Sequence, residues 1–324
     1  MTQPLKTKSV AIIGAGMAGF AAAKILADDG YKPVMFEKSK GIGGRMATRR
    51  IDDEVAFDHG AQYARVRSDE FLAFLVGLGD SAGVWTPRVK DDTVATDKPL
   101  YVGVSGMNRL LEPLRERVDL RLNTLVSGLL VGADGVIITL EDGSTESFDR
   151  VICTIPVPQA RVLFGTDQAL VDAMSVVEVD PCWSLMVTFE QPLGVTFDAW
   201  RNVSDELGWV ARNTSKPGRN GLDCWVVHAR GDWSREHLER TKEDIAPDML
   251  AMFADAVSID FPEVRSARAH RWRYSQTVTP LGQSYLQSAD GRCFIGGDWA
   301  LGGRIEAAFG SGTEMGRAAI AALG

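Results

Sequence analysis

A short apolar run, a helical pattern of small residues and a second apolar run open the chain. Val10–Ile13 is continuously hydrophobic, as expected of a strand buried on both faces. From Met17 to Asp29, apolar residues recur at helical spacing on one face, and Gly30 offers a stop. The segment PVMFEK predicts a second strand. Strand, helix and strand within about thirty residues predict a βαβ unit.

The middle of the chain predicts a helix and then a series of strands. The helix is GMNRLLEPLRERV, with its inward-facing side at Leu110, Leu111 and Leu114. GLLVGADGVIITLEDGSTESFDRVICTIP follows as three strands, with Asp-Gly turns at 134–135 and 142–143. The last of these strands, RVICTIP, is apolar enough to lie inside a sheet.

Between residues 181 and 274, strands and helices form separate runs. WSLMVTFE, CWVVHAR and HRWRY predict strands, and EHLERTKEDIAPDMLAMFADAV predicts a helix interrupted near Pro247. Segregated runs are typical of an α+β domain on a mixed or antiparallel sheet. On HRWRY, strand alternation would place His270, Trp272 and Tyr274 on one face and the two arginines on the other.

Composition and charge narrow the class of protein. The chain is 45% hydrophobic and 24% charged, which is ordinary for a globular protein, and its 324 residues favour two domains. A formal net charge of -8 disfavours nucleic acid and anionic membranes as partners. No apolar run reaches membrane-spanning length and no signal peptide is evident, so we expect a cytoplasmic protein. Its dispersed cysteines, Cys153, Cys182, Cys224 and Cys293, indicate neither disulfides nor a metal site.

The first apolar run ends in the pattern Gly14-x-Gly16-x-x-Gly19. Gly14 permits a tight turn, Gly16 lets backbone approach a pyrophosphate, and Gly19 lets helix and strand pack closely. Glu37 follows eighteen residues after Gly19, at the end of the second strand, where a carboxylate can accept both ribose hydroxyls and would repel a 2′-phosphate. The pattern predicts a site for FAD or NAD. The alternatives are a packing turn and an exposed glutamate.

Two further motifs favour FAD. Gly43-Gly44-Arg45 follows Glu37 and could hold phosphate, although a solvated turn would look similar. Near the other end, an apolar strand runs into Gly296-Gly297-Asp298, and a helix is predicted to start near Ile305. The amides of such a helix would stabilise negative charge on a reduced flavin. Two nucleotide-contacting ends suit a long, retained FAD better than an exchanging NAD.

With these segments in view, the sequence resembles the bacterial renalase-like flavoproteins of the flavin amine oxidase superfamily. The resemblance rests on VAIIGAGMAG, FEKSKGIGGRMATRR, FDHGAQYARVRS, GMNRLLEPL, HRWRY and GGDWALGGRIEAAFGSG, and it covers essentially the whole chain. It implies an α/β fold: a Rossmann-like FAD/NAD(P)-binding domain of the glutathione-reductase/p-hydroxybenzoate-hydroxylase type, with an interleaved α+β substrate domain on a mixed or antiparallel sheet. We expect residues 1–64, 97–165 and 275–324 in the first domain, and 65–96 and 166–274 in the second.

The resemblance also implies an activity. Renalase-like enzymes take hydride from the 2- and 6-dihydro isomers of NAD(P) to flavin N5, and O2 reoxidises the flavin to give hydrogen peroxide. This chemistry needs little acid–base help, and we find no GxSxG or HExxH motif. We therefore assign no catalytic side chain. The expected partners are the dinucleotide substrate and O2, with no metal, nucleic acid or membrane, and the protein would be a monomer or homodimer.

The FAD would be bound non-covalently through residues of the quoted motifs. The expected cofactor-binding set is Gly14, Gly16, Met17, Ala18, Gly19, Glu37, Lys38, Gly44, Arg45, Met46, Gly60, Ala61, Gln62, Val126, Gly297, Asp298, Arg304, Ile305 and Glu306. Within that set, Gln62 would lie near the isoalloxazine and the Val126 backbone near the adenine.

Substrate-pocket residues are harder to separate from ordinary packing. Tyr63, His228, His270 and Trp272 are the candidates, but a half-buried strand would explain the last two and a satisfied sheet histidine would explain His228. The densest basic set is Arg49, Arg50, Arg65 and Arg67, which surface charge would also explain. Trp183 is predicted to be core.

Two other functions remain open on the sequence. The same scaffold supports amine or polyamine oxidases and desaturases, and the aromatic residues here are numerous enough for an amine-binding cage. A non-catalytic binding protein with the flavin fold would be expected to lose its cofactor motifs, which are intact here.

Overall fold

The computed structural model describes residues 6–52, 55–94 and 97–324. The chain forms two compact units that alternate along the sequence. Unit 1 comprises residues 1–44, 111–179 and 277–324, and unit 2 comprises residues 45–110 and 180–276. Residues 45–64 and 97–110, expected in the cofactor domain, cluster with unit 2, whereas 166–179 cluster with unit 1.

Unit 1 is built on a six-stranded sheet of order β18-β19-β12-β1-β2-β8. Its strands are β1 (Val10–Ile13), β2 (Val34–Phe36), β8 (Asp119–Arg121), β12 (Arg150–Cys153), β18 (Tyr285–Gln287) and β19 (Cys293–Gly296). The pairs β2·β8, β1·β2, β1·β12 and β12·β19 are parallel, and β18 is antiparallel to β19. The apolar run at the start of the chain therefore becomes a central strand, which is why all four of its residues are buried.

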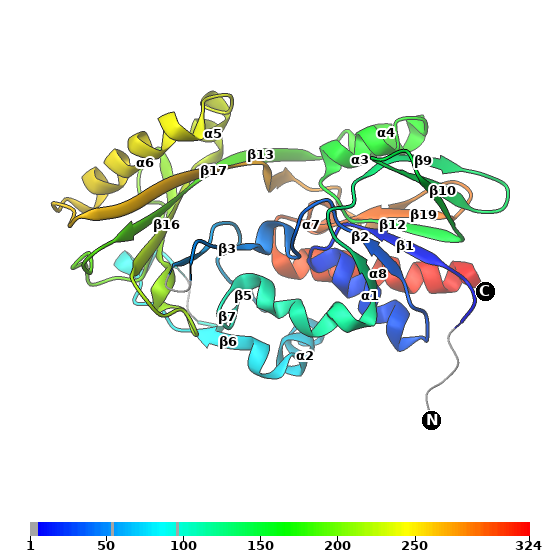
Figure 1. Cartoon of the computed structure of the whole chain (residues 1–324), viewed down its shortest axis with the longest axis horizontal. Helices are drawn as coiled ribbons and strands as arrows, with labels where there is room; N and C mark the ends of the chain where they lie inside the picture. The colour runs from blue at the N-terminus through cyan, green and yellow to red at the C-terminus, as the bar shows by residue number, and fades with distance from the viewer. Residues whose placement is uncertain (1–5, 53–54, 95–96) are drawn as a thin grey trace. The chain divides into compact units, whose positions relative to one another are not determined.

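Two long helices lie side by side in unit 1 (Figure 1). They are α1 (Met17–Asp28) and α8 (Ile305–Leu323), which begins where the sequence predicted. Glycines allow their close approach, since a Cβ at Gly312 would lie 2.1 Å from Ala18 O. The short α7 (Asp298–Leu301) precedes α8, and α3 (Val157–Leu163) and α4 (Gln168–Met174) follow β12.

A separate antiparallel sheet, β11-β10-β9, completes unit 1. Its strands are β9 (Val126–Val131), β10 (Val136–Leu140) and β11 (Thr145–Phe148). The predicted strand series therefore divides, because RVICTIP supplies β12 of the larger sheet. The α-helix expected over 106–118 is wrong: the segment forms two 3-10 helices, Met107–Leu110 and Glu112–Arg117, the second with Pro113 in its first turn. The three leucines are nevertheless buried.

Unit 2 is built on a five-stranded sheet of order β14-β15-β16-β13-β17. The strands are β13 (Glu178–Phe189), β14 (Ala199–Arg201), β15 (Leu207–Arg212), β16 (Asp223–Ala229) and β17 (Val264–Thr279). One face of the sheet packs against α6 (Lys242–Val257). The hydrophobic core between them includes Trp183 and Trp225 of the sheet and Phe253 of the helix. Trp183 is thus a core residue, as predicted.

The helical region of unit 2 breaks at a different place from the one predicted. α5 (Gly231–Glu236) ends before α6 starts, and α6 runs through Pro247 without interruption. The Thr241 side chain caps α6 by accepting the Asp244 N–H at 3.2 Å, so the helix begins five residues before the proline. The break therefore precedes Thr241, and the expectation of an interruption at Pro247 is wrong.

The other face of this sheet is covered by a hairpin and a loop. Strands β3 (Thr48–Arg50) and β4 (Ala56–Asp58) pair antiparallel, and Phe57 packs against Met186 and Val226 of the sheet. Unit 2 also holds a small sheet of β5 (Ala64–Arg65), β7 (Leu100–Gly103) and β6 (Ala82–Trp85), together with α2 (Asp69–Gly77). Short 3-10 helices span Gly44–Met46, Gly79–Ser81, Lys90–Asp92 and Asn213–Ser215.

Candidate cofactor and substrate sites

The glycine turn of unit 1 has the geometry that each glycine was expected to provide. Gly14 has φ +106°, and its N–H donates to Phe36 O at 2.8 Å. A Cβ at Gly19 would lie 2.1 Å from Gly14 O, so only glycine fits there. At Gly16, by contrast, the nearest atom to a Cβ would be Gly43 O at 4.0 Å. That open space is what close backbone approach of a phosphate requires.

The start of α1 is suited to an anion. Its N-cap is Gly16, no side chain caps the helix, and its first turn holds no acidic residue. Met17 and Ala18 are buried apolar residues of that first turn. First-turn amides have no intrahelical acceptor, so they combine with the helix dipole to favour a phosphate.

Glu37 joins the surrounding loops into one cradle. It is only 8% exposed, and its carboxylate accepts the Ala15 N–H at 2.9 Å and the Ser39 N–H at 2.8 Å. Each oxygen keeps acceptor capacity for a ribose hydroxyl. Gly43 N donates to Ala15 O at 2.8 Å, which brings the glycine doublet beside the first turn. The interpretation of Glu37 as an exposed strand-end residue is therefore excluded.

The remaining unit 1 residues of the predicted set lie at strand and helix starts. Gly44 has φ +54°, Val126 begins β9, and Gly297 has φ +150° immediately before α7. Asp298 is the first residue of α7 and is 8% exposed. Arg304, Ile305 and Glu306 form the start of α8, which has no side-chain cap, and Lys38 is exposed. The open turn, the uncapped helix starts and the buried carboxylate together fit a dinucleotide cofactor.

The rest of the predicted cofactor set belongs to unit 2. Arg45 and Met46 lie in the 3-10 helix that follows Gly44, and Arg45 Nη1 donates to Ser275 O at 3.1 Å. Gly60 packs tightly, since a Cβ there would lie 2.1 Å from Arg45 O. Ala61 N donates to the same carbonyl at 2.8 Å. The GAQY loop is thus held against the residues that follow the glycine doublet.

A buried ionic network holds the GAQY loop in place. Asp58 is fully buried, and its Oδ2 lies 3.2 Å from Lys216 Nζ and 2.6 Å from Arg219 Nη2. Burial would raise the pKa of Asp58, but the two cations outweigh it and hold the pKa at about 2. Burial lowers the pKa of Lys216 to about 8, although Asp58 opposes the shift. At neutral pH the network holds two cations and one carboxylate.

Gln62 is part of this network. Its Oε1 accepts from Lys216 Nζ at 3.0 Å, and its Nε2 donates to the carbonyls of Asp58 and Gly60. Both amide atoms therefore help to fix the loop, and both N–H donors have acceptors. A contact between Gln62 and the isoalloxazine stays a prediction, and it would have to be made by atoms other than these amide donors.

Two histidines and a tryptophan form an aromatic cluster in unit 2. The ring centroid of His59 lies 4.7 Å from that of His270 and 4.9 Å from that of Trp272. Trp272 Nε1 donates a hydrogen bond to His59 O at 2.9 Å. Burial lowers the pKa of His59 to about 4 and that of His270 to about 3. Both imidazoles are therefore neutral at pH 7. The alternation predicted for HRWRY is confirmed, since Arg271 lies over Trp183 on the opposite face.

Strand register brings four more side chains into a line across the same face. Arg201 of β14 lies opposite Trp209 of β15, and Trp209 lies opposite His228 of β16. His228 in turn lies opposite Ser184 of β13. We call these four residues the cross-strand row. Sequence reasoning identified only His228, because the other three become neighbours only through strand pairing.

The cross-strand row leaves several polar atoms without partners. Trp209 Nε1, His228 Nε2 and Ser184 Oγ are buried and make no hydrogen bond. Burial lowers the pKa of His228 to about 4. At one end of the row Arg201 is exposed, and its Nη2 donates to the Tyr63 hydroxyl at 2.8 Å. Buried groups of this kind are ordinarily satisfied, so three such atoms in neighbouring residues are unusual.

The predicted basic set does not form one anion site. Arg65 pairs with Asp97, Arg50 Nη2 donates to Ser105 O at 3.0 Å, and Arg67 is exposed. Only Arg49 bears on the aromatic cluster, where its charge contributes to the lowered pKa values of His59 and His270.

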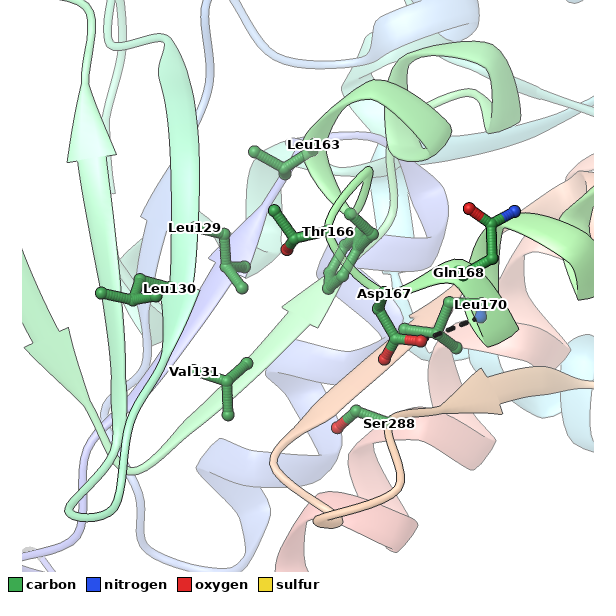
Figure 2. Close-up of a pocket in the computed structure, with 10 residues that line it drawn as sticks. Leu129, Leu130, Val131, Leu163, Thr166, Asp167, Gln168, Leu170 and Ser288 are labelled. Atoms are coloured by element: carbon green, nitrogen blue, oxygen red, sulfur yellow. Dashed lines mark hydrogen bonds between the residues drawn. The ribbon is translucent and has the colours of Figure 1, made fainter.

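A cavity in unit 1 lies among residues outside the predicted cofactor set. It has a volume of about 350 Å³ and lies between β9, the α3–α4 region and the turn at Ser288 (Figure 2). Its walls include Leu129, Leu163 and Leu170, while Asp167 accepts the Leu170 N–H at 3.1 Å as the cap of α4. Asp167, one of the polar residues that line this cavity, is thus already used by the fold.

Metal and thiol chemistry find no support in the described parts of the chain. Within residues 6–52, 55–94 and 97–324, no three His, Cys, Asp or Glu side chains gather as metal ligands. The four cysteines are free thiols, and burial raises the pKa of Cys153 and Cys293 to about 12 and that of Cys224 to about 11. Such thiols are inert at neutral pH.

Comparison with known families agrees with this geometry. The profile of the flavin containing amine oxidoreductase family matches residues 81–320, and that of the NAD(P)-binding Rossmann-like domain matches residues 12–78. The chain belongs to the flavin containing amine oxidoreductase family. It is an FAD-dependent oxidoreductase, which confirms the predicted cofactor, enzyme class and fold class.

Individual proteins are also similar to this chain. Renalase of Mus musculus is 21% identical over 301 residues, covering 84% of this chain and 86% of the relative. L-amino acid oxidase of Cerastes cerastes is 43% identical over 54 residues, or 17% of this chain and 10% of that protein. A crystal structure from Exiguobacterium sp. 255-15, described as a candidate protoporphyrinogen oxidase, has a TM-score of 0.75 at 13% identity. It covers 97% of this chain and 98% of its own, and it supports the fold.

None of the helices in residues 6–52, 55–94 and 97–324 combines the length and the hydrophobicity of a membrane span.

Proposed function

We propose that this flavoenzyme oxidises the 2- and 6-dihydro isomers of NAD(P) to the aromatic dinucleotide. Bound FAD would supply the hydride acceptor, at N5, and would be reoxidised by O2 to yield hydrogen peroxide. Unit 1 would hold the cofactor through the glycine turn and Glu37, and unit 2 would bind the substrate. The resemblance to renalases suggests this reaction, and the chemistry of the cross-strand row supports it.

The observation that carries the proposal is the charge of that row. Its His228 and the adjoining His59 and His270 are neutral at pH 7, because burial lowers their pKa values to between about 3 and about 4. The nearby buried carboxylate, Asp58, is already paired with Lys216 and Arg219. A neutral dihydropyridine ring fits such a surface, and the cation Arg201 suits its phosphates.

An amine substrate suits the same surface less well. A protonated amine is stabilised by a free carboxylate, and none belongs to the cross-strand row. The buried network instead carries an excess positive charge, which would repel an ammonium group. Amine oxidation, the other activity open on the sequence, is therefore the competing outcome of the experiment.

Anaerobic mixing tests the proposal. Purified holoprotein is mixed without O2 with 6-dihydro-NAD, 2-dihydro-NAD, ordinary NADH and a panel of primary and polyamines, and the flavin absorbance is followed. We expect fast bleaching by the 2- and 6-dihydro isomers, and one hydrogen peroxide per substrate when O2 is admitted. Bleaching by amines alone would overturn the proposal.

A further inference from the structure

The cavity in unit 1 is a pocket that neither the cofactor set nor the cross-strand row uses. Its volume of about 350 Å³ falls within the range of small-molecule pockets, roughly 300–1,000 Å³. It lies along the last three residues of β9, whereas Val126, the predicted adenine contact, begins that strand. Thr166 and Gln168 of its lining are exposed, so a dissolved ligand can enter it.

Apolar side chains form most of the pocket wall. Leu129 and Val131 point from β9 toward the α3–α4 region, while Leu130 between them points away and is 65% exposed (Figure 2). The opposite wall includes Leu163, Phe164 and Leu170. Walls of this kind favour a ligand with a hydrocarbon body.

A single carboxylate gives the pocket its charge. Among the described residues that line it, Asp167 is acidic and none is Lys, Arg or His. The capping bond to the Leu170 N–H, at 3.1 Å, occupies only Oδ1 of Asp167. Within residues 6–52, 55–94 and 97–324, Oδ2 accepts no hydrogen bond and the carboxylate forms no ion pair. Figure 2 shows this carboxylate pointing toward the turn at Ser288.

Basic side chains on the neighbouring elements are held by backbone carbonyls. Arg161 of α3 donates to the carbonyls of Met174 and Val177. Arg292 donates to the Gly132 carbonyl, in the turn after β9, at 2.8 Å. Neither arginine lines the pocket. The negative charge of the capping carboxylate is therefore left for solvent or for a ligand cation.

We propose that this pocket binds a primary ammonium group carried on a compact hydrocarbon body. The ammonium donates to Asp167 Oδ2, and the hydrocarbon lies against Leu129, Val131 and Leu163. A neutral alcohol keeps the packing but loses the charge-assisted hydrogen bond, and a carboxylate is repelled by Asp167. None of these residues belongs to the cofactor cradle or to the cross-strand row, so the inference is independent of the proposed function.

The first test titrates the FAD-loaded protein with three probes that share one hydrocarbon cage. 1-Adamantylamine, 1-adamantanol and 1-adamantanecarboxylate present an ammonium, a hydroxyl and a carboxylate on that cage. The carbon that bears the amine has no hydrogen, so the flavin cannot remove hydride from it and binding is measured without turnover. Calorimetry should show the amine binding about tenfold more tightly than the alcohol, and no measurable binding of the acid. Equal affinities of the amine and the alcohol, or no binding of the amine, would overturn the inference.

The second test locates the binding with matched variants. Asp167→Asn keeps a side-chain oxygen for the α4 cap but removes the charge, so the amine should bind about tenfold more weakly and the alcohol as before. Leu163→Trp fills part of the pocket and should weaken both probes. Asp172→Asn removes an exposed charge five residues later in α4, outside the pocket, and should change neither affinity. The flavin-to-protein absorbance ratio and the denaturation midpoint verify that each variant is folded.

Each outcome decides the assignment. An amine that keeps its full affinity in Asp167→Asn binds elsewhere, and the assignment fails. Equal weakening by Asp167→Asn and Asp172→Asn would mean that the net charge of -8 attracts the probe, which also overturns it. A preference for the amine that is lost in Asp167→Asn and retained in Asp172→Asn supports it. Bleaching by the dihydro isomers is a separate measurement, so this inference and the proposed function can fail independently.

Discussion

The two units of this protein differ in what forms their candidate cofactor and substrate sites: mostly backbone in unit 1 and side chains in unit 2. In unit 1 the cradle is mostly backbone: a turn at Gly14, the open approach at Gly16 and the first amides of α1, with Glu37 bracing them. In unit 2 the candidate site is made of side chains on five strands, and its members come together only through register. The first kind of site follows from the spacing of residues along the sequence, whereas the second forms only when the tertiary structure is complete.

Replacing a cradle glycine should have the largest effect. Gly19→Ala would place a Cβ 2.1 Å from Gly14 O, where backbone cannot move away cheaply. We expect a loss of about 4 kcal/mol or more in stability and no flavin-loaded protein, measured by soluble yield and flavin absorbance. Gly41→Ala, at a site with nothing within 4 Å, is the matched control and should keep its flavin. A yellow, stable Gly19→Ala protein would contradict the backbone account of unit 1.

The corresponding change in unit 2 removes a buried charge. Asp58→Asn leaves Lys216 and Arg219 as buried cations without their shared carboxylate, which should lower the free energy of unfolding by about 3–5 kcal/mol. Denaturant titration measures the change. Glu239→Gln removes the exposed partner of Arg273 and should leave the midpoint unmoved. Equal effects of the two substitutions would mean that the buried network does not stabilise unit 2.

A change of charge at Glu37 should act on the cofactor more than on the fold. Glu37→Arg replaces the ribose acceptor by a cation and breaks the bonds to Ala15 and Ser39, so the FAD dissociation constant should rise by about 100-fold. Ultrafiltration of the holoprotein followed by flavin quantitation measures retention. If this variant holds FAD as tightly as the parent, the placement of the adenosine ribose is wrong.

Mild acid should distinguish the two units without any substitution. All four histidines lie in unit 2, and for His59, His228 and His270 burial lowers the pKa to about 4, 4 and 3. Between about pH 6.5 and 4 the unfolded chain binds protons that the folded chain does not, so stability is complete above this window and falls as the pH falls through it. Each histidine contributes at most about 1.4 kcal/mol per pH unit.

Spectroscopy can assign that acid effect to a unit. Seven of the eight tryptophans lie in unit 2, with Trp299 in unit 1, so intrinsic fluorescence reports mainly on unit 2 while flavin absorbance reports on the cofactor. The tryptophan signal should show the acid dependence, and His228→Gln should make it shallower. A denaturation midpoint that is constant from pH 7 to pH 5 would contradict the neutral imidazoles.

The sequence predicted best those elements whose structure depends on residues close to one another in the chain. β1, α1 and α8 start where hydrophobic spacing and glycines placed them, because each depends on neighbours within a few residues. Pro113 and Pro247 show the limit of such rules. One proline lies in a segment that winds as 3-10 helix, and the other is accommodated inside α6.

The side-chain site could not be predicted in the same way. Lys216 lies in the segment NTSKPGRN, to which the sequence analysis assigned no role, and its ammonium is fully buried against Asp58. Arg201 and Trp209 lie eight residues apart, Ser184 lies seventeen residues before Arg201, and no motif links the three. Their relation follows from the pairing of β13 to β16, which one sequence alone does not specify.

The strand order of unit 1 has a consequence for biosynthesis. β1 is the first strand of this sheet to be synthesised. Its neighbour on the side away from β2 is β12, and β19, the other neighbour of β12, is synthesised more than 130 residues after β12. Until then an apolar strand edge stays uncovered, open to pairing with another nascent chain. Expression yield should therefore respond to slower translation and to lower temperature, because both change how long that edge stays unpaired before β19 and α8 dock.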